Sequence, residues 1–374
     1  MEQSLRSPRT DGARASPRAP RPLPAVDRGN SRTHRPRPFT LAHPERDPRM
    51  STMADAPRAQ RRAVLVPTMN RLDDMMEMID SVLAQSVPVH VFAVVDAGDT
   101  PTLETRLLQK LTPAGIELIY RTSTPGTSLQ RNIGLDLLAE QLEPDDLVFF
   151  FDDDVLLEPN FVEEVIRCMH LPVEPAVGCV LATFTQEPRP RGWQQTWFRM
   201  FQMTHQVAGD QAHLGAAGAV QWLMEPSTDV PVPVASGGRT CYRWSAIANE
   251  RLDEFLPGYT LNEDVEYSFR VAKIWTIIHS PTVRLFHKRS PKGRVDYGDR
   301  LSRMIYSQFY FFRKHRPRDP GHLAALAWNA VGTSTFYVAA GLLKSDSKDR
   351  VGALKGVMHG YRKCIDELKK PRPE

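Results

Sequence analysis

The chain has 374 residues, 41% of them hydrophobic, so it is long enough to bury one large core with appendages and is globular rather than fibrous. The formal net charge is +4, and much of the basic excess lies in the first fifty residues, so we expect no nucleic-acid partner. Four scattered cysteines form no CxxC pair, and no apolar run near the N-terminus suits a signal peptide, which favours the reducing cytoplasm.

Residues 1–60 are dominated by Arg, Pro, Ser and Thr, as in the segments 7–10 and 35–39. Such a composition cannot bury enough apolar surface to offset the entropy of ordering, which predicts a disordered tail. A basic arm attracted to anionic lipid is an alternative. Translation that begins at Met50 or Met53 is a third, and the sequence does not decide among them.

The segment 61–296 shows the alternation of a doubly wound α/β domain. Residues 63–67 form an apolar run that ends in a proline, as a buried parallel strand does. A helix is predicted over 72–85 and a strand over 89–96, which completes a βαβ unit. The same alternation continues through these predicted elements: a helix over 102–111, a strand over 115–120, a helix over 128–141 and a strand over 147–151. We therefore predict a mostly parallel sheet with flanking helices.

The remaining segments of the chain are less regular. Residues 183–233 carry tryptophans and apolar residues at helical spacing, and the chain turns helical beyond residue 294. We predict a separate C-terminal helical region over 297–374. Its stretch 323–343 has no charged residue but is only weakly apolar. This pattern favours a helix that packs on the domain or lies on a membrane surface over one that spans a bilayer.

Three aspartates, Asp152 to Asp154, directly follow the most apolar predicted strand. Adjacent carboxylates repel one another unless something positive lies close to them. Alternate residues of an extended segment point to one side, so Asp152 and Asp154 are candidate ligands of a hard cation such as Mg²⁺ or Mn²⁺. The alternative is a helix cap or an acidic turn.

A second acidic pair, Glu263 and Asp264, follows Asn262, which can cap a helix over the next residues. Acidic residues are favoured at helix N-termini through the dipole alone, so the pair also has a purely structural explanation. His287 ends a predicted strand and precedes a basic loop with Lys288, Arg289, Lys292 and Arg294. A lone histidine is usually structural, but this one could join a cation and phosphates.

A third segment, 124–135, contains Gly126, which allows a tight approach, and then Arg131 and Asn132 at the start of a helix. Helix N-termini and arginine forks both suit phosphate or ribose oxygens.

In this order the motifs resemble those of the family 2 glycosyltransferases, inverting enzymes with the GT-A fold. The resemblance covers about residues 62–294. It rests on these segments: 66–71 as the first-strand turn, Asp96 as the second-strand aspartate, 131–134 as the RN-x-G segment, Asp152 to Asp154 as the DxD motif, and then 236–238, 263–264 and His287.

The resemblance implies a role for each matched residue. The donor-binding residues would be Pro67, Thr68, Asn70, Arg71, Asp96, Arg131, Asp152, Asp153, Gly237 and Gly238. Asp154 and His287, with Asp152, would bind Mg²⁺ or Mn²⁺. Asp264 would be the general base, with Glu263 as the alternative. The expected partners are a nucleoside-diphosphate sugar and a glycan or lipid-linked acceptor, with peripheral membrane contact near the basic segment 313–318.

Two departures from the family pattern limit these expectations. The segment 308–315 lacks the tryptophan of the QxxRW motif of processive members, so we expect one sugar to be added per encounter. The turn 96–99 reads Asp-Ala-Gly-Asp rather than Asp-x-x-Ser, which leaves the nucleotide base open.

Three other classes of protein compete with this interpretation. A haloacid dehalogenase-like phosphatase also presents Asp-x-Asp after an apolar strand, but it continues with Gly-Thr, whereas Val155 and Leu156 follow here. A sugar nucleotidyltransferase needs a glycine-rich loop after its first strand, which 67–71 does not provide. A degenerate binding protein would lack the acidic pair or the base, whereas this sequence retains candidates for both.

Overall fold

The computed structural model describes residues 58–187, 192–207, 211–255, 261–290, 295–343 and 347–373. Residues 58–60 are the described part of the predicted tail 1–60, and Lys292 and Arg294 of the basic loop lie outside the described residues. Residues 58–374 form one compact unit.

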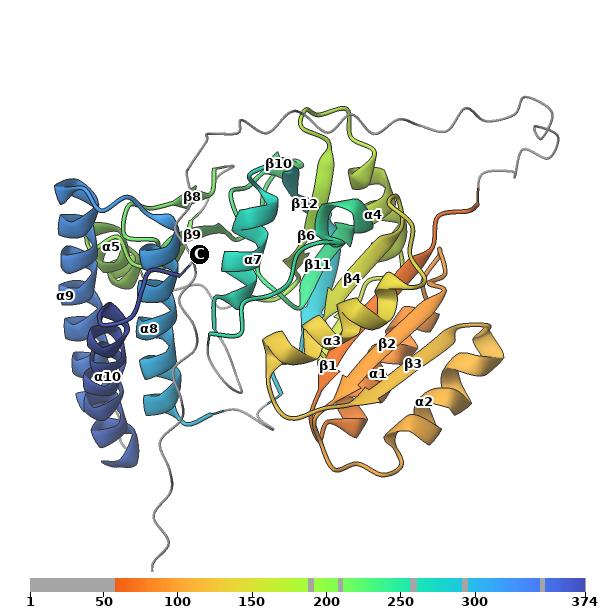
Figure 1. The fold of residues 1–374 in the computed structure, drawn as a ribbon, viewed down its shortest axis with the longest axis horizontal. Coiled ribbons are helices and arrows are strands. Elements are labelled where there is room, and N and C mark those ends of the chain that lie inside the picture. The colour runs from red at the N-terminus through yellow and green to blue at the C-terminus, as the bar shows by residue number, and fades with distance from the viewer. Residues whose placement is uncertain are drawn as a thin grey trace, which may run out of the picture. The chain divides into compact units, whose positions relative to one another are not determined.

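A mixed sheet forms the centre of the fold (Figure 1). Within the described residues it has nine strands in the order β10-β12-β6-β11-β4-β1-β2-β3, with β5 paired to β12. Strands β3, β2, β1 and β4 are parallel to one another, β11 is antiparallel to both of its neighbours, and β6 and β12 are again parallel. Their bounds are β1 Arg62–Thr68, β2 Val91–Asp96, β3 Glu117–Thr122, β4 Leu147–Phe151, β5 Val155–Leu157, β6 Val177–Phe184, β10 Val230–Pro231, β11 Arg239–Arg243 and β12 Thr276–His287.

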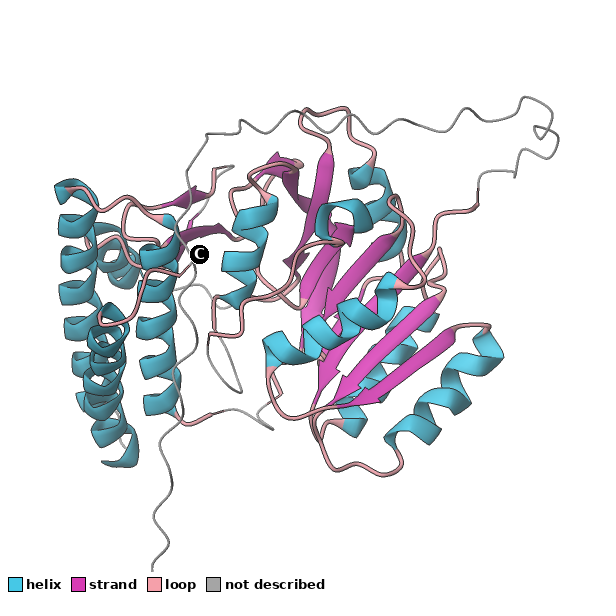
Figure 2. Cartoon of the chain, viewed as in Figure 1, coloured by secondary structure: helices cyan, strands magenta, loops and turns pink. Residues whose placement is uncertain are grey.

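Helices cover both faces of this sheet, as Figure 2 shows. Successive side chains of β4 point to opposite faces, so Phe149 packs with Met75 and Phe161 in one core while Phe150 packs with Tyr267 in the other. One core is closed by α1 (Leu72–Leu83), α2 (Leu103–Leu111) and α4 (Phe161–Met169), and the other by α3 (Thr127–Ala139), α6 (Trp244–Ile247) and α7 (Glu263–Val271). The predicted doubly wound α/β architecture is confirmed.

The segment 183–233 is less helical than its apolar spacing predicts. Of its described residues, 183–187, 192–207 and 211–233, only α5 (Gly192–Met200) is helical, and a small sheet follows in the order β7-β9-β8. Its strands are β7 His205–Val207, β8 His213–Leu214 and β9 Val220–Leu223. Glycines and prolines interrupt the apolar pattern, and Gly218 has a φ of 77°, which ends any regular helix.

Three helices form the C-terminal region, as predicted: α8 Tyr297–His315, α9 Pro320–Leu342 and α10 Ser347–Leu368. Figure 1 shows them side by side. Among the described helices, none combines the length and hydrophobicity that a bilayer-spanning segment requires. Gly298 of α8 faces Gly352 and Gly356 of α10, so the two backbones approach closely.

The contact between α8 and α10 makes a testable prediction. A Cβ at position 356 would lie 2.4 Å from the Gly298 carbonyl oxygen, whereas one at position 352 would meet that glycine's nitrogen at an ordinary 3.6 Å. Both substitutions to alanine gain about 1 kcal/mol of helix propensity, but Gly356→Ala must also displace backbone at a cost of about 1–3 kcal/mol. We expect Gly356→Ala to lower the melting temperature and Gly352→Ala to raise it or leave it unchanged. Equal melting temperatures for both variants would contradict this packing.

Candidate functional site

The acidic triplet emerges from the middle of the sheet. Strand β4 is buried along its whole length and lies between β1 and β11. Asp152 to Asp154 follow it at the edge where β1 and β2 also end. Side chains that are far apart in the sequence therefore meet at this edge, which is where parallel α/β sheets bind ligands.

Asp153 joins the turn after β1 to the triplet. Thr68 Oγ1 donates a hydrogen bond of 2.8 Å to one of its oxygens, and Arg71 Nη1 donates one of 2.8 Å to the other. Burial raises the pKa of Asp153 to about 6, although Arg71 and Thr68 both favour its charged form. Asp153 therefore orients Thr68 and Arg71, which are two of the predicted donor-binding side chains. Direct contact of Asp153 with a donor stays a prediction.

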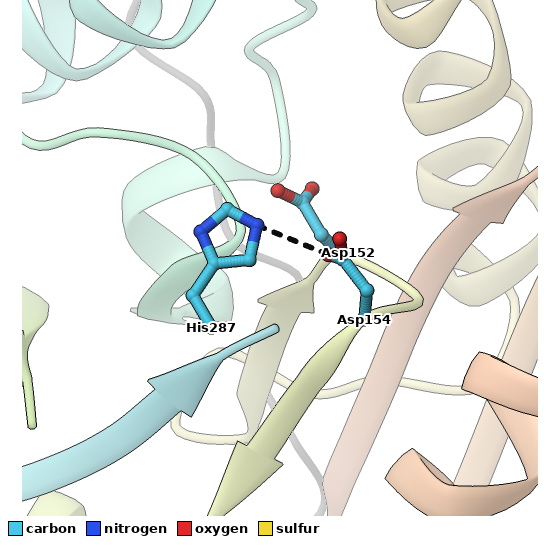
Figure 3. A group of neighbouring side chains, drawn as sticks. All are labelled: Asp152, Asp154 and His287. Carbon is cyan, nitrogen blue, oxygen red and sulfur yellow. Dashed lines mark ion pairs between the residues drawn. The ribbon is translucent and has the colours of Figure 1, made fainter. Parts of the chain in front are cut away.

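Asp154 and His287 face each other across a short gap (Figure 3). The Nε2 atom of His287 lies 3.1 Å from Asp154 Oδ1, and the other oxygen accepts a hydrogen bond of 2.9 Å from the Ser290 amide. Burial raises the pKa of Asp154, but His287, the Ser290 amide and Arg71 outweigh it, so the pKa lies below its usual value. Asp152 completes the group, whose three ligand atoms all lie within 4.8 Å of one another.

These three side chains fit a divalent cation. Octahedral Mg²⁺ with bonds of about 2.1 Å separates adjacent ligand atoms by about 3 Å, which is close to the 3.1 Å between Asp154 and His287. Asp154 Oδ1 is buried, and in the described part of the chain its 3.1 Å contact with His287 Nε2 does not have hydrogen-bond geometry. An unsatisfied buried carboxylate oxygen is costly, and coordination by a cation would satisfy it.

Strand pairing explains how His287 reaches the triplet. Val155, which follows the triplet, begins β5, and it pairs directly with His287 at the end of β12. The ring of Phe184 stacks on the imidazole, with the centroids 5.4 Å apart. Backbone pairing therefore holds His287 on one side, and the Phe184 ring holds its imidazole on the other.

Arg131 connects the triplet to the second acidic pair. It lies on α3 and is only 2% exposed. Its Nη2 atom donates a 3.0 Å hydrogen bond to Asp152, and its Nη1 atom donates a 3.4 Å hydrogen bond to Glu263. One buried cation thus lies between carboxylates from β4 and α7.

Asp264 lies in the first turn of α7 and is partly exposed, unlike its neighbour Glu263. One oxygen of Asp264 accepts the Gly237 amide hydrogen, and the other accepts that of Val265 at 2.8 Å. Burial raises the pKa of both acids, and the Asp264 charge adds to the effect on Glu263. The expectation that Asn262 caps α7 is wrong, since its φ is 64° and its side chain makes no capping bond; a side-chain cap requires an extended backbone there.

The residues predicted to hold the nucleoside shape two adjoining turns. Asn70 Oδ1 accepts the Asp99 amide hydrogen at 2.8 Å, and Asp96 accepts that of Gly98 at 2.7 Å and the Tyr120 hydroxyl hydrogen at 2.8 Å. Pro67 and Thr68 end β1 beside them. The structure brings these residues together next to Asp153, while their contact with a nucleoside stays a prediction.

Other polar residues that support the site are not identified by sequence reasoning. Gln130 donates hydrogen bonds to the carbonyls of Thr68 and Val95 and so joins the ends of β1 and β2. Arg239 is buried, donates to Ser236 Oγ and lies 4.3 Å from the Phe184 ring centroid; burial lowers its pKa to about 10. Polar residues on a helix face that should be apolar are the signal that could have found Gln130. Arg239 offers none.

A cavity of about 540 Å³ opens beside His287. It is lined by Phe184, Thr185, Gln186, Glu187, Met224, Glu225, Phe286, His287, Lys288 and Arg289. Six of these come from the segment 183–233, which we expect to border the acceptor. The volume lies in the range of small-molecule sites.

Comparison with known proteins identifies the family. The sequence model of the family described as Glycosyltransferase like family 2 matches residues 58–274. No curated protein matches the chain. S. aureus TarS 1-349 in complex with UDP-GlcNAc is 14% identical with a TM-score of 0.49, over 82% of this chain and 89% of that one. Mannosyltransferase PcManGT from Pyrobaculum calidifontis, in complex with GDP-Man and Mn2+, is 14% identical with a TM-score of 0.49, over 83% and 87%.

Gly238 allows a test of the proposed cation site. Its φ is 75°, and a Cβ there would lie 2.2 Å from Asp152 Oδ2. Gly115 has a similar φ of 71° but open space around it. Alanine at either position carries the same backbone strain of about 1–2 kcal/mol, so Gly115→Ala is a matched control. We expect only Gly238→Ala to weaken Mn²⁺ binding, by about tenfold or more, as measured by titration calorimetry. Equal affinities in the two variants would argue against Asp152 as a ligand.

Proposed function

Because this chain belongs to glycosyltransferase like family 2, we propose that it transfers one sugar from a nucleoside-diphosphate sugar to an acceptor hydroxyl. The transfer inverts the anomeric centre and requires Mg²⁺ or Mn²⁺. The observation that carries the proposal is the group of Asp152, Asp154 and His287 beside the partly exposed carboxylate of Asp264. The family match favours this function over the phosphatase alternative.

Asp154 and His287, with Asp152, are the residues that would hold the cation. A bound divalent cation supplies positive charge that stabilises the leaving nucleoside diphosphate. The protein's contribution is to hold the ligands in place before the donor arrives, through the Ser290 amide, the β5–β12 pairing and the Phe184 ring. Arg131 keeps the Asp152 carboxylate in position from the opposite side.

Asp264 is the proposed general base. The acceptor oxygen forms a bond to the anomeric carbon while the bond from that carbon to the diphosphate oxygen breaks, and Asp264 accepts the acceptor's proton. Two backbone amides fix its carboxylate, and each oxygen keeps a further lone pair for the proton. Burial raises its pKa toward the working range of a base.

Glu263 is less suited to this role. It is buried against Arg131, and its pKa is raised to about 8, so it is largely protonated at neutral pH. A protonated carboxyl cannot accept the acceptor's proton. We infer that Glu263 instead holds Arg131 in place.

The donor and acceptor lie on different sides of the cation group in this proposal. The nucleoside occupies the edge formed by Thr68, Asn70, Arg71 and Asp96, where Asp153 holds Thr68 and Arg71. The acceptor, a glycan or a lipid-linked saccharide of cell-surface polysaccharide synthesis, occupies the 540 Å³ cavity beside His287. The four cysteines are all free and buried, which is compatible with a cytoplasmic location.

The first test is binding of nucleoside diphosphates and their sugars, measured by thermal shift with and without Mn²⁺. We expect one nucleotide to raise the melting temperature only when Mn²⁺ is present, and Asp154→Ala to abolish that rise. Asp80→Ala, which removes an exposed carboxylate on α1, is the control. A shift that is independent of metal, or that survives in Asp154→Ala, would overturn the cation site.

The second test separates the two candidate bases. Asp264→Asn should lower kcat by about 10²–10⁴-fold, the usual contribution of a general base, with donor affinity retained. Glu263→Gln should lower kcat less than tenfold, because the amide replaces a carboxyl that is already largely neutral. The opposite ranking of the two variants would make Glu263 the base.

The pH dependence of wild-type activity is a separate test. The value of kcat/KM should fall at acid pH with a midpoint above the ordinary aspartate pKa, since burial raises the Asp264 pKa and only the carboxylate form is active.

A further inference from the structure

Helix α10 has three distinct faces. Ala353, Val357 and Cys364 are buried toward the other helices. A second face is apolar yet exposed, and each of its side chains is more than half exposed: Val351, Leu354, Met358, Ile365 and Leu368. With 3.6 residues per turn, these five positions fall within an arc of about 100° and form a continuous stripe. Soluble helices normally turn such a stripe toward a core.

The third face of α10 is basic. It carries Lys355, Arg362 and Lys363, next to the apolar stripe on the helical wheel, and Lys369 and Lys370 follow directly after the helix. Over residues 350–373 the acidic side chains are Asp366, which pairs with Lys369 at 2.7 Å, and Glu367, which is buried against Arg313 and pairs with Lys370 at 3.0 Å. The exposed surface of this helix therefore combines apolar side chains with a strong positive charge.

Helix α9 also exposes apolar side chains. No charged residue occurs between positions 323 and 343, and several large apolar side chains are exposed there: Leu323, Trp328, Val331, Leu342 and Leu343. Of these, Leu323 lines one cavity together with Ile365 and Leu368 of the α10 stripe, and we call Leu323 and the α10 stripe the C-terminal apolar surface.

An apolar cavity of about 300 Å³ opens between α8, α9 and α10. Leu323, Ile365 and Leu368, which belong to the C-terminal apolar surface, are among its lining residues. Its polar residues bond to protein partners: Gln308 donates to Asn329 at 3.0 Å, and the Tyr361 hydroxyl donates to the Ala330 carbonyl at 3.0 Å. The cavity therefore offers hydrocarbon rather than hydrogen-bonding groups to a ligand.

We propose that the C-terminal apolar surface docks on the surface of an anionic bilayer. An exposed apolar stripe beside a basic stripe is the arrangement by which helices lie in the lipid interface, with the apolar face among acyl chains and the cations at the headgroups. A second copy of this chain is a poorer occupant, because pairing the apolar stripes would place the basic faces of two copies side by side. This inference goes beyond the proposed function and does not depend on it.

Flotation of the full-length chain with lipid vesicles tests the inference. We expect binding to vesicles of equimolar phosphatidylcholine and phosphatidylglycerol, weaker binding to pure phosphatidylcholine, and loss of binding as salt increases. The double variant Leu354→Glu/Met358→Glu should lower vesicle binding by about tenfold or more. Its matched control is Leu108→Glu/Ile274→Glu, which changes two exposed apolar residues outside the C-terminal helices.

A charge-reversal pair tests the basic face independently. Lys355→Glu/Arg362→Glu should also lower binding by about tenfold or more, whereas Arg106→Glu/Arg121→Glu, on α2 and β3, should not. Circular dichroism of each variant shows whether the fold is kept, and only folded variants are compared. Equal binding by the Leu354/Met358 variant and its control would overturn the proposal, because the contact would then lie elsewhere, as in the basic residues 1–57. A dimer in solution that the same substitutions dissociate, without vesicle binding, would overturn it in favour of a second copy.

Discussion

Five acidic side chains converge at one edge of the sheet, and the buried guanidinium of Arg131 is the interaction that joins the group after β4 to the pair on α7. The acids are Asp152, Asp153, Asp154, Glu263 and Asp264. Arg131 donates to Asp152, which directly follows β4, and to Glu263 on α7, and leaving such a buried cation uncompensated typically costs about 3–5 kcal/mol. The same contact fixes the distance between the cation ligands and the proposed base. Stability and catalytic geometry therefore depend on one side chain.

The space around Arg131 explains why two glycines precede β11. A Cβ at Gly237 would lie 3.0 Å from Arg131 Nη1, and the Gly237 amide is also the donor to Asp264. Gly238 leaves room for the Asp152 carboxylate. The glycine pair thus lets a backbone segment pass between the acids and supply an amide to one of them. Side chains at these positions would separate the cation group from the base.

The parts of this site that lie on regular elements could be predicted from sequence, and the parts that depend on long-range packing could not. The buried strand before Asp152 and the alternation of strands and helices are local patterns, and they located the edge of the sheet correctly. The position of Arg239 against Phe184 depends on the pairing of β11 with β6, which no local pattern encodes. Asn262 shows the same limit, because its left-handed backbone comes from its surroundings and not from its own propensity to cap. In 183–233, apolar spacing suited a helix, but strand pairing in the β7-β9-β8 sheet prevailed.

The C-terminal helices belong to the construction of the site. Glu266 lies on α7 two residues after Asp264 and is 1% exposed. Its carboxylate lies 2.9 Å from His315 Nε2 and 3.2 Å from Lys314 Nζ, both at the end of α8. Without these two partners the buried carboxylate would keep Arg270 of its own helix, and a buried carboxylate with fewer partners is destabilised. The Gly237 amide therefore holds Asp264 directly, and contacts of Glu266 with the end of α8 hold α7, the helix that carries this proposed base.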